Sequence, residues 1–261
     1  MAFWSVACTV VAIAASVCTW AARQPPLPPA RCVRSGSPLV GLRCSFLATV
    51  VGTLCWSMQT LSRIMVCSYD GAHCLRFAGA VQFSTFTRWC WMLQGLYYLL
   101  SLTFRTSPMV GRVRQVTFEI SVAMALLVTT MTYAVLVPGA LLMDRPHQRG
   151  NIELLLSPQG HIMHSLNTVF IMTDFALGRP TSRIGMVDVP YGICFGVAYV
   201  IFEWIFHART GLWHYPFLNY DMPFVELAYV ALFAVFVLFW WLGAAVSNYL
   251  SCEVVAEQKA L

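Results

Sequence analysis

Charged side chains are scarce in this chain, and their scarcity excludes most soluble folds. Of its 261 residues, 10% are Asp, Glu, Lys or Arg, whereas 59% are hydrophobic. A soluble globule of this size needs more polar surface, so the composition predicts an integral membrane protein. The net charge of +5 comes from arginines in short loops, without a basic run interleaved with aromatic residues. Membrane orientation explains this charge better than nucleic acid binding does.

A second absence concerns strand periodicity. No window alternates apolar and polar residues over about ten positions, as the strands of a membrane barrel would require. The apolar runs are instead long enough, at roughly 20 residues, to cross a bilayer as helices. We therefore expect an all-α, multi-pass transmembrane bundle of six core spans plus an extra N-terminal anchor span, the second and fifth spans being the weakest. The seven runs are 2–22, 44–62, 88–104, 116–138, 160–178, 188–207 and 224–247.

Proline and charge divide the chain into segments. Four of the positions 25–29 are proline and basic residues flank them, which predicts an extended linker. With Met1 outside, ten of the sixteen basic residues fall on the cytosolic side, as the positive-inside rule requires, whereas cleavage after the first span would invert this bias. The endoplasmic reticulum and the plasma membrane both stay open as locations. The expected divisions are a hydrophobic anchor or signal (1–22), the linker (23–43), a transmembrane helical domain (44–250) and a short cytosolic tail (251–261).

The common catalytic and cofactor motifs are missing as well. The chain has no HExxH helix, nucleophile elbow, P-loop or dinucleotide fingerprint, and its six histidines are too few for the eight of a histidine-box desaturase. We expect neither a metal nor a cofactor. Internal repeats and paired broken helices are absent, which disfavours transport. The ten cysteines lie mostly within spans and form no disulfide framework, but Cys67 and Cys74 share an outer loop, where a pairing in an oxidising lumen stays open.

One apolar segment carries a stripe of polar side chains. Helical spacing places four of them along one flank of the fifth span: His161, His164, Asn167 and Asp174. Ionisable groups inside a bilayer mark functional sites, so this flank should face a protein interior or a cavity. Asn167 is spaced to orient His164. Asp174 lies about 15 Å deeper than His164, and we expect it to pair with a group on another span, such as Glu203, Gln94 or a backbone atom.

A hydroxyl, an imidazole and an aromatic loop are expected at one membrane face. In the orientation above, the third span begins near Thr87 and the fifth near His164, both at the outer face. Threonine is a weak nucleophile until a base removes its proton, and histidine is the usual base. Two structural roles compete, with Thr87 capping the third helix and His164 bonded across helices for packing. The outer loop also contributes His207 and His214, and its aromatic residues either form an interfacial belt or line an entrance for a lipid chain: Trp213, Tyr215 and Phe217.

Three segments together resemble the androgen-induced family of multi-pass membrane threonine hydrolases. They are FTRWCWMLQGLYY from Phe86, HIMHSLNTVFIMTD from His161 and TGLWHYPFL from Thr210, the third being the most specific. With the spans between them, they cover roughly residues 44–250. The resemblance implies a catalytic threonine at Thr87, a catalytic histidine at His164, and fatty acid esters of hydroxy fatty acids as substrates.

The chain also departs from that family. The segment from His164 to Val169, with Asp174 after it, is similar to the related rolling stone branch, which is linked to cell fusion and has no assigned reaction. The hydrolases carry a double histidine before the third segment, whereas His207 is followed here by Ala208. Residues 1–43 have no counterpart in the family.

The resulting prediction is an integral membrane lipid-ester hydrolase whose partners are membrane lipids and a lipid-ester substrate. His164 would deprotonate Thr87 for attack on the ester carbonyl, Asn167 would orient the base, and Gln94 would hydrogen-bond the oxyanion or the substrate. The alternative is a non-catalytic membrane protein of the rolling stone type, acting in adhesion, fusion or scaffolding, whose polar stripe only fixes helix packing. The sequence by itself leaves open whether the chain is an enzyme.

Overall fold

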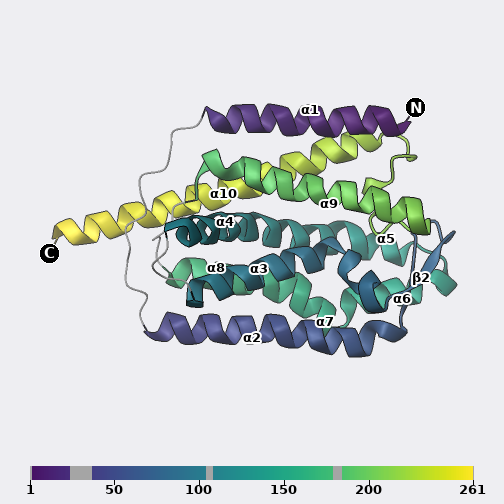
Figure 1. Cartoon of the computed structure of the whole chain (residues 1–261), viewed down its shortest axis with the longest axis horizontal. Helices are drawn as coiled ribbons and strands as arrows, with labels where there is room; N and C mark the ends of the chain where they lie inside the picture. Colours follow the sequence, from purple (N-terminus) through teal and green to yellow (C-terminus); the bar gives the residue numbers. More distant parts are fainter. Residues whose placement is uncertain (1, 24–36, 104–107, 179–183, 261) are drawn as a thin grey trace.

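Long helices lie side by side and alternate in direction along the molecule (Figure 1). The computed structural model describes residues 2–23, 37–103, 108–178 and 184–260. Its helices are α1 (Ala2–Ala22), α2 (Ser37–Thr60), α3 (Phe86–Thr103), α4 (Pro108–Met131), α5 (Val137–Leu141), α6 (Arg145–Leu156), α7 (Pro158–His161), α8 (Asn167–Leu177), α9 (Val189–Thr210) and α10 (Val225–Ala260). Two π-helical turns, Thr132–Leu136 and Ile162–Leu166, join α4 to α5 and α7 to α8. The predicted all-α class is confirmed.

Five of the described helical segments are long and apolar enough to cross a membrane. They are Phe3–Ala21, Leu39–Arg63, Met109–Leu141, Met186–Thr210 and Val225–Tyr249. The second expected span, weak in the sequence, is among them, whereas α3 and the α7–α8 pass are not. Polar residues interrupt these two passes, and both pack between α2 and α4 (Figure 1). Neighbouring helices therefore shield their polar groups from lipid.

The linker and tail differ in extent from the prediction. Helix α2 begins at Ser37 rather than near residue 44, because the Ser-Pro pair at its start suits the first turn of a helix. The remainder of the predicted linker, residues 24–36, lies outside the described residues. Helix α10 continues through Ala260, so the predicted tail is helical up to that residue.

The N-terminal helix packs against the rest of the bundle. Helix α1 contacts α9 and α10. The ring of Phe3 lies 5.2 Å from that of Trp204 and 5.5 Å from that of Tyr220. In addition, the Ser5 hydroxyl donates a 2.8 Å hydrogen bond to Glu226. The first pass is therefore held by side-chain contacts as well as by the chain connection.

A cap covers the end of the bundle where α3 begins and α9 ends (Figure 1). Strands β1 (Met65–Cys67) and β2 (Cys74–Arg76) form an antiparallel hairpin. A disulfide joins Cys67 to Cys74, so the pairing that the sequence left open is present. The Cys67 N–H donates to Asn151 Oδ1 at 3.0 Å, and Asn151 Nδ2 donates to the Cys67 carbonyl at 2.8 Å. Helix α6 thereby holds the hairpin onto the bundle.

Candidate functional site

Thr87 lies in the first turn of α3, and the loop after α9 holds this turn from outside. The N-cap position belongs to Thr85, whose carbonyl accepts from the Arg88 N–H at 3.1 Å. The Phe86 N–H, unpaired within the helix, donates to the Tyr215 hydroxyl at 2.9 Å. Thr87 is buried and is a further hydrogen-bond partner of that hydroxyl. Thr87 therefore lies within the first turn of the helix rather than at its N-cap position.

Tyr215 presents a neutral hydroxyl at this turn. Burial raises the pKa of its phenol above the usual value, and the nearby Glu203 carboxylate raises it further. The phenol therefore keeps its proton at neutral pH. This hydroxyl accepts from Phe86 and Thr87 and is also a hydrogen-bond partner of the Tyr199 hydroxyl, which itself donates to the Ser84 carbonyl, so the Tyr215 O–H is directed at Tyr199.

His164 lies in the π-helical turn between α7 and α8. Ser157 begins this pass as N-cap, with its hydroxyl accepting from the Gly160 N–H at 3.0 Å and Pro158 following at the first helical position. The π-helical turn interrupts the regular α-helical bonding, and the Thr129 hydroxyl of α4 donates to the His164 carbonyl. Helix α4 therefore holds the turn that positions the imidazole.

The His164 imidazole has one nitrogen available for proton transfer. The ring is buried, and the Leu155 carbonyl is a hydrogen-bond partner for it. Nδ1 has no hydrogen-bond partner among the described residues. The bond to Leu155 therefore belongs to Nε2, which carries the proton of the neutral ring and leaves Nδ1 as an acceptor.

Two cavities meet at Thr87. The first, here called the polar cavity, encloses about 610 Å³ of space between atoms, including its open part. Its polar lining residues are Tyr69, Thr85, Thr87, Arg88, Asn151, His164, His214 and Tyr215. The second, the apolar cavity, encloses about 670 Å³ on the same measure, and its lining includes Met124, Val128, Gly196, Val200, Phe233 and Phe236. Thr87, Leu136 and Tyr215 line both cavities. The structure thus brings Thr87 and His164 to one space and places a hydrocarbon-lined chamber beside it.

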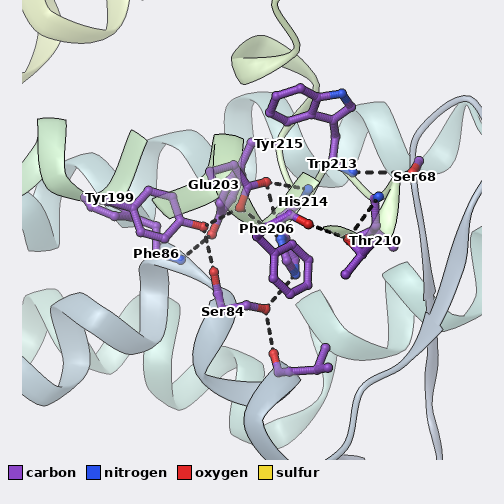
Figure 2. Close-up of polar contacts among 12 residues, drawn as sticks. Ser68, Ser84, Phe86, Tyr199, Glu203, Phe206, Thr210, Trp213, His214 and Tyr215 are labelled. Carbon is purple, nitrogen blue, oxygen red and sulfur yellow. Dashed lines mark hydrogen bonds and ion pairs between the residues drawn. The ribbon is translucent and has the colours of Figure 1, made fainter. Parts of the chain in front are cut away.

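A chain of buried hydrogen bonds fixes the loop that carries Tyr215 (Figure 2). Glu203 of α9 accepts from the His214 backbone N–H at 2.7 Å, and its other oxygen lies 3.0 Å from His214 Nδ1. His214 Nε2 lies 2.8 Å from Ser84 Oγ, and the Tyr199 hydroxyl donates to the Ser84 carbonyl at 2.8 Å. These hydrogen bonds link α9, the outer loop and the segment before α3. They therefore set where Tyr215 meets the start of α3.

The contacts from Ser84 to His214 to Glu203 have the distances of a serine–histidine–acid triad. In a triad the serine donates to the histidine, whereas here the histidine donates to the serine. The Ser84 hydroxyl donates to the Val81 carbonyl at 2.6 Å. His214 Nε2 must therefore donate to Ser84 Oγ, and a histidine that donates to a serine does not take its proton. Ser84 is 1% exposed and lines neither of the two cavities. These hydrogen bonds position the loop rather than activating a nucleophile.

Asp174 is bound at a distance from the two cavities. It accepts from Arg43 Nε at 2.8 Å and from the Tyr97 hydroxyl. The expected kind of partner, a group on another pass, is present, but it is neither Glu203 nor Gln94. The reason is the earlier start of α2, which brings Arg43 out of the predicted linker and into a helix that packs beside α8.

Gln94 and Asn167 meet each other rather than Thr87. Gln94 Nε2 donates to the Asn167 carbonyl at 3.2 Å and to the Tyr98 hydroxyl at 3.0 Å. Neither residue lines the polar or the apolar cavity, and Asn167 Nδ2 has no partner among the described residues. The structure therefore brings together Thr87, His164, His214 and Tyr215 of the predicted site and leaves Gln94 and Asn167 in a deeper layer.

The remaining predicted site residues lie around the outer end without lining either cavity. His161 Nδ1 lies 2.8 Å from the Tyr133 hydroxyl, on an exposed side of the pass. The His207 ring stacks on the Trp213 ring with 4.0 Å between the centroids. The backbone N–H of Trp213 donates to Ser68 Oγ of the hairpin at 3.4 Å. Across the part of the chain that the structure describes, no three His, Cys, Asp or Glu side chains are grouped to hold a metal ion.

Sequence reasoning overlooked Arg88, which lines the polar cavity and is 1% exposed. The available signal was an arginine directly after the candidate nucleophile, at the start of an apolar run.

Five long apolar helices make the chain a multi-pass membrane protein. No protein-family model, curated protein or solved structure matches it.

Proposed function

We propose that the chain is a lipid-ester hydrolase acting within the membrane, with Thr87 as nucleophile and His164 as base. The observation that carries the proposal is that both residues line the polar cavity and that Thr87 also lines the apolar cavity. An acyl chain in the apolar cavity would place its ester group at Thr87. The resemblance to the threonine hydrolases points to the same two residues and to fatty acid esters of hydroxy fatty acids.

In each half of the proposed reaction, His164 takes up one proton and gives it away again. Nδ1 takes the proton of the Thr87 hydroxyl while Oγ1 attacks the ester carbonyl carbon, and the protonated ring then gives that proton to the departing alcohol. The same ring next deprotonates a water molecule, which attacks the acyl–threonine ester; the free acid leaves, and the ring returns the proton to Oγ1 of Thr87. Tyr215, which lines the polar cavity beside Thr87, would take the oxyanion role that the sequence assigned to Gln94, with its O–H turning from Tyr199 to the oxyanion.

The proposed site faces an oxidising compartment. The Cys67–Cys74 disulfide lies at the same end of the bundle as Thr87 and lines the polar cavity through Cys67. Disulfides persist in the lumen of the endoplasmic reticulum and outside the cell, not in the cytosol. This side agrees with the orientation that the loop charges favour.

A non-catalytic membrane protein of the rolling stone type is the second candidate. The observation that favours it is that Thr87 bonds to Tyr215, while no hydrogen bond joins Thr87 to His164 among the described residues. In the enzyme, the bond between Thr87 and His164 forms when substrate is bound. In a non-catalytic protein, it never forms.

Labelling with a fluorophosphonate probe separates the two candidates. Membranes carrying the wild type and Thr87→Ser should label, whereas Thr87→Val and His164→Gln should lose at least nine-tenths of the label, about one factor of ten. Thr85→Val removes a neighbouring hydroxyl that lines the same cavity, and His161→Gln removes an exposed imidazole of the same pass. Both controls should keep the label. A well-expressed wild type that never labels would favour the non-catalytic protein.

A further inference from the structure

The polar cavity holds a buried cation with no anion to balance it. Arg88 Nη1 donates to Gln82 Oε1 at 2.8 Å, and Nη2 donates to Ser57 Oγ at 2.9 Å. Both acceptors are neutral, and none of the ion pairs within the described residues includes Arg88. Arginine stays charged in proteins, and a buried charge without a counter-ion is costly. Within the residues that the structure describes, this positive charge therefore has no partner of opposite sign.

The guanidinium packs against a residue of the cavity wall. Its central carbon lies 5.1 Å from the centroid of the Phe77 ring, and Phe77 and Arg88 both line the polar cavity. Gln82, which accepts from Arg88, is itself fixed by a 3.0 Å hydrogen bond from Nε2 to the Phe77 carbonyl. The cation is thus preorganised rather than mobile, and the face of Phe77 offsets only part of its charge.

The rest of the cavity suits an amphiphile. No aspartate or glutamate is among its lining residues, so nothing there repels an anion. The other walls are largely apolar, with Leu136, Leu154, Leu155 and Met163 among them. The cavity adjoins the apolar cavity at Thr87, Leu136 and Tyr215, which leaves room for a hydrocarbon chain beyond the charged end.

We infer that the polar cavity binds the anionic group of an amphiphile, with Arg88 as its counter-ion and the hydrocarbon chain in the apolar cavity. One uncompensated charge calls for one negative charge, either a carboxylate or a phosphodiester, because a guanidinium binds both through paired N–H groups. This binding does not require hydrolysis at Thr87 and so goes beyond the proposed function. Where hydrolysis occurs, Arg88 selects esters that carry a negative charge on the part lying in the polar cavity.

Competition on the unmodified protein tests the inference directly. The full chain, purified in an uncharged detergent, is photocrosslinked to a diazirine-bearing C16 fatty acid in the presence of two matched pairs of competitors. One pair is oleate and methyl oleate, and the other is lysophosphatidylglycerol and monoolein. At least one anionic member should compete about tenfold or more better than its neutral partner, and the pair that shows this identifies carboxylate or phosphodiester. Equal competition within both pairs would overturn the inference.

Variants then assign the preference to one side chain. Arg88→Met should abolish the preference for the anion, whereas Arg88→Lys, which keeps the charge, should retain part of it. Arg76→Met is the matched control, because Arg76 is an exposed cation of the same cap whose hydrogen bond within the described residues runs to the Ser62 carbonyl at 2.7 Å. A folded Arg88→Met protein with the preference intact would refute the assignment. If Arg88→Met does not fold, the competition experiments on the wild type and on Arg88→Lys still test the anion preference and its dependence on Arg88.

The inference and the proposed hydrolysis fail separately. Thr87→Val should lose the fluorophosphonate label and yet still prefer the anionic competitor to its neutral partner, because Arg88 is untouched. Anion preference without fluorophosphonate labelling would refute hydrolysis and leave the binding site standing. Labelling without anion preference would refute the anion-binding site and leave the proposed hydrolysis standing.

Discussion

Replacing Cys67 and Cys74 together by serine is expected to loosen the outer wall of the polar cavity. The two cysteines are seven residues apart, so the disulfide closes a short loop. Closing a loop of about eight residues removes chain entropy from the opened hairpin worth roughly 2.5 kcal/mol at 25 °C. Without the bond, the hairpin should open roughly 60 times more often, at about 1.4 kcal/mol per factor of ten. Val66, Cys67, Tyr69 and Phe77 belong to the wall that would move.

Hydrogen–deuterium exchange measures this opening, because an amide exchanges only when its hydrogen bond breaks. The reporters are the Ser68 N–H, bonded to the His73 carbonyl at 2.8 Å, and the Phe77 N–H, bonded to the Ile64 carbonyl at 2.8 Å. Both should exchange tens of times faster in the double variant, while amides in the middle of α4 stay unchanged. Replacing the free Cys55 by serine is the control for thiol removal. Hairpin exchange within about threefold of the wild type would refute the chain-entropy reasoning.

Three further substitutions test the loop, the apolar cavity and a turn. Glu203→Gln replaces one carboxylate oxygen by an NH₂ donor, so the contacts of Glu203 with the His214 backbone N–H and with Nδ1 cannot both be kept; we expect a cost of about 2 kcal/mol and lost fluorophosphonate labelling, and an unchanged melting temperature and label would contradict this. Gly196→Leu should fold, because no atom lies within 4 Å of the added Cβ, yet weaken competition by oleate about tenfold. The same change at Gly52, equally open but outside the cavity, should have no effect, and equal effects at both sites would implicate helix propensity instead. Gly211→Ala should destabilise by about 1–3 kcal/mol in thermal melts, because φ is +73° and the new Cβ would lie 2.7 Å from a histidine ring of the hairpin; an unaltered melt would count against the strain.

Hydropathy predicted the passes well where helices face lipid and less well where they face protein. The run 2–22 coincides with α1, and the run 188–207 starts one residue before α9 and ends three residues before it does. The third and fifth passes are less apolar because their polar residues face neighbouring helices. A window average cannot distinguish such a pass from a loop, since burial by protein is decided by which helices pack together.

The partner of Asp174 shows how one boundary changes a site prediction. Extending α2 back to Ser37 brings Arg43 into a helix, and an ion pair with Asp174 follows. The expected partners, Glu203 and Gln94, are instead engaged by His214 and Asn167. Helix boundaries are the weakest part of a sequence prediction, and partner choice inherits that weakness.

The sequence by itself determined the class of the protein, its helical passes, and the end of the bundle that Thr87 and His164 share. Each of these follows from composition, run length or the alternation of inside and outside along the chain. Only the tertiary structure decided that Tyr215 bonds to the first turn of α3, that Glu203, His214 and Ser84 form one chain, and that Arg88 is buried without an anion. These contacts join distant positions, 129 residues apart for Phe86 and Tyr215. Local spacing carries no signal for such contacts, because packing of the whole bundle creates them.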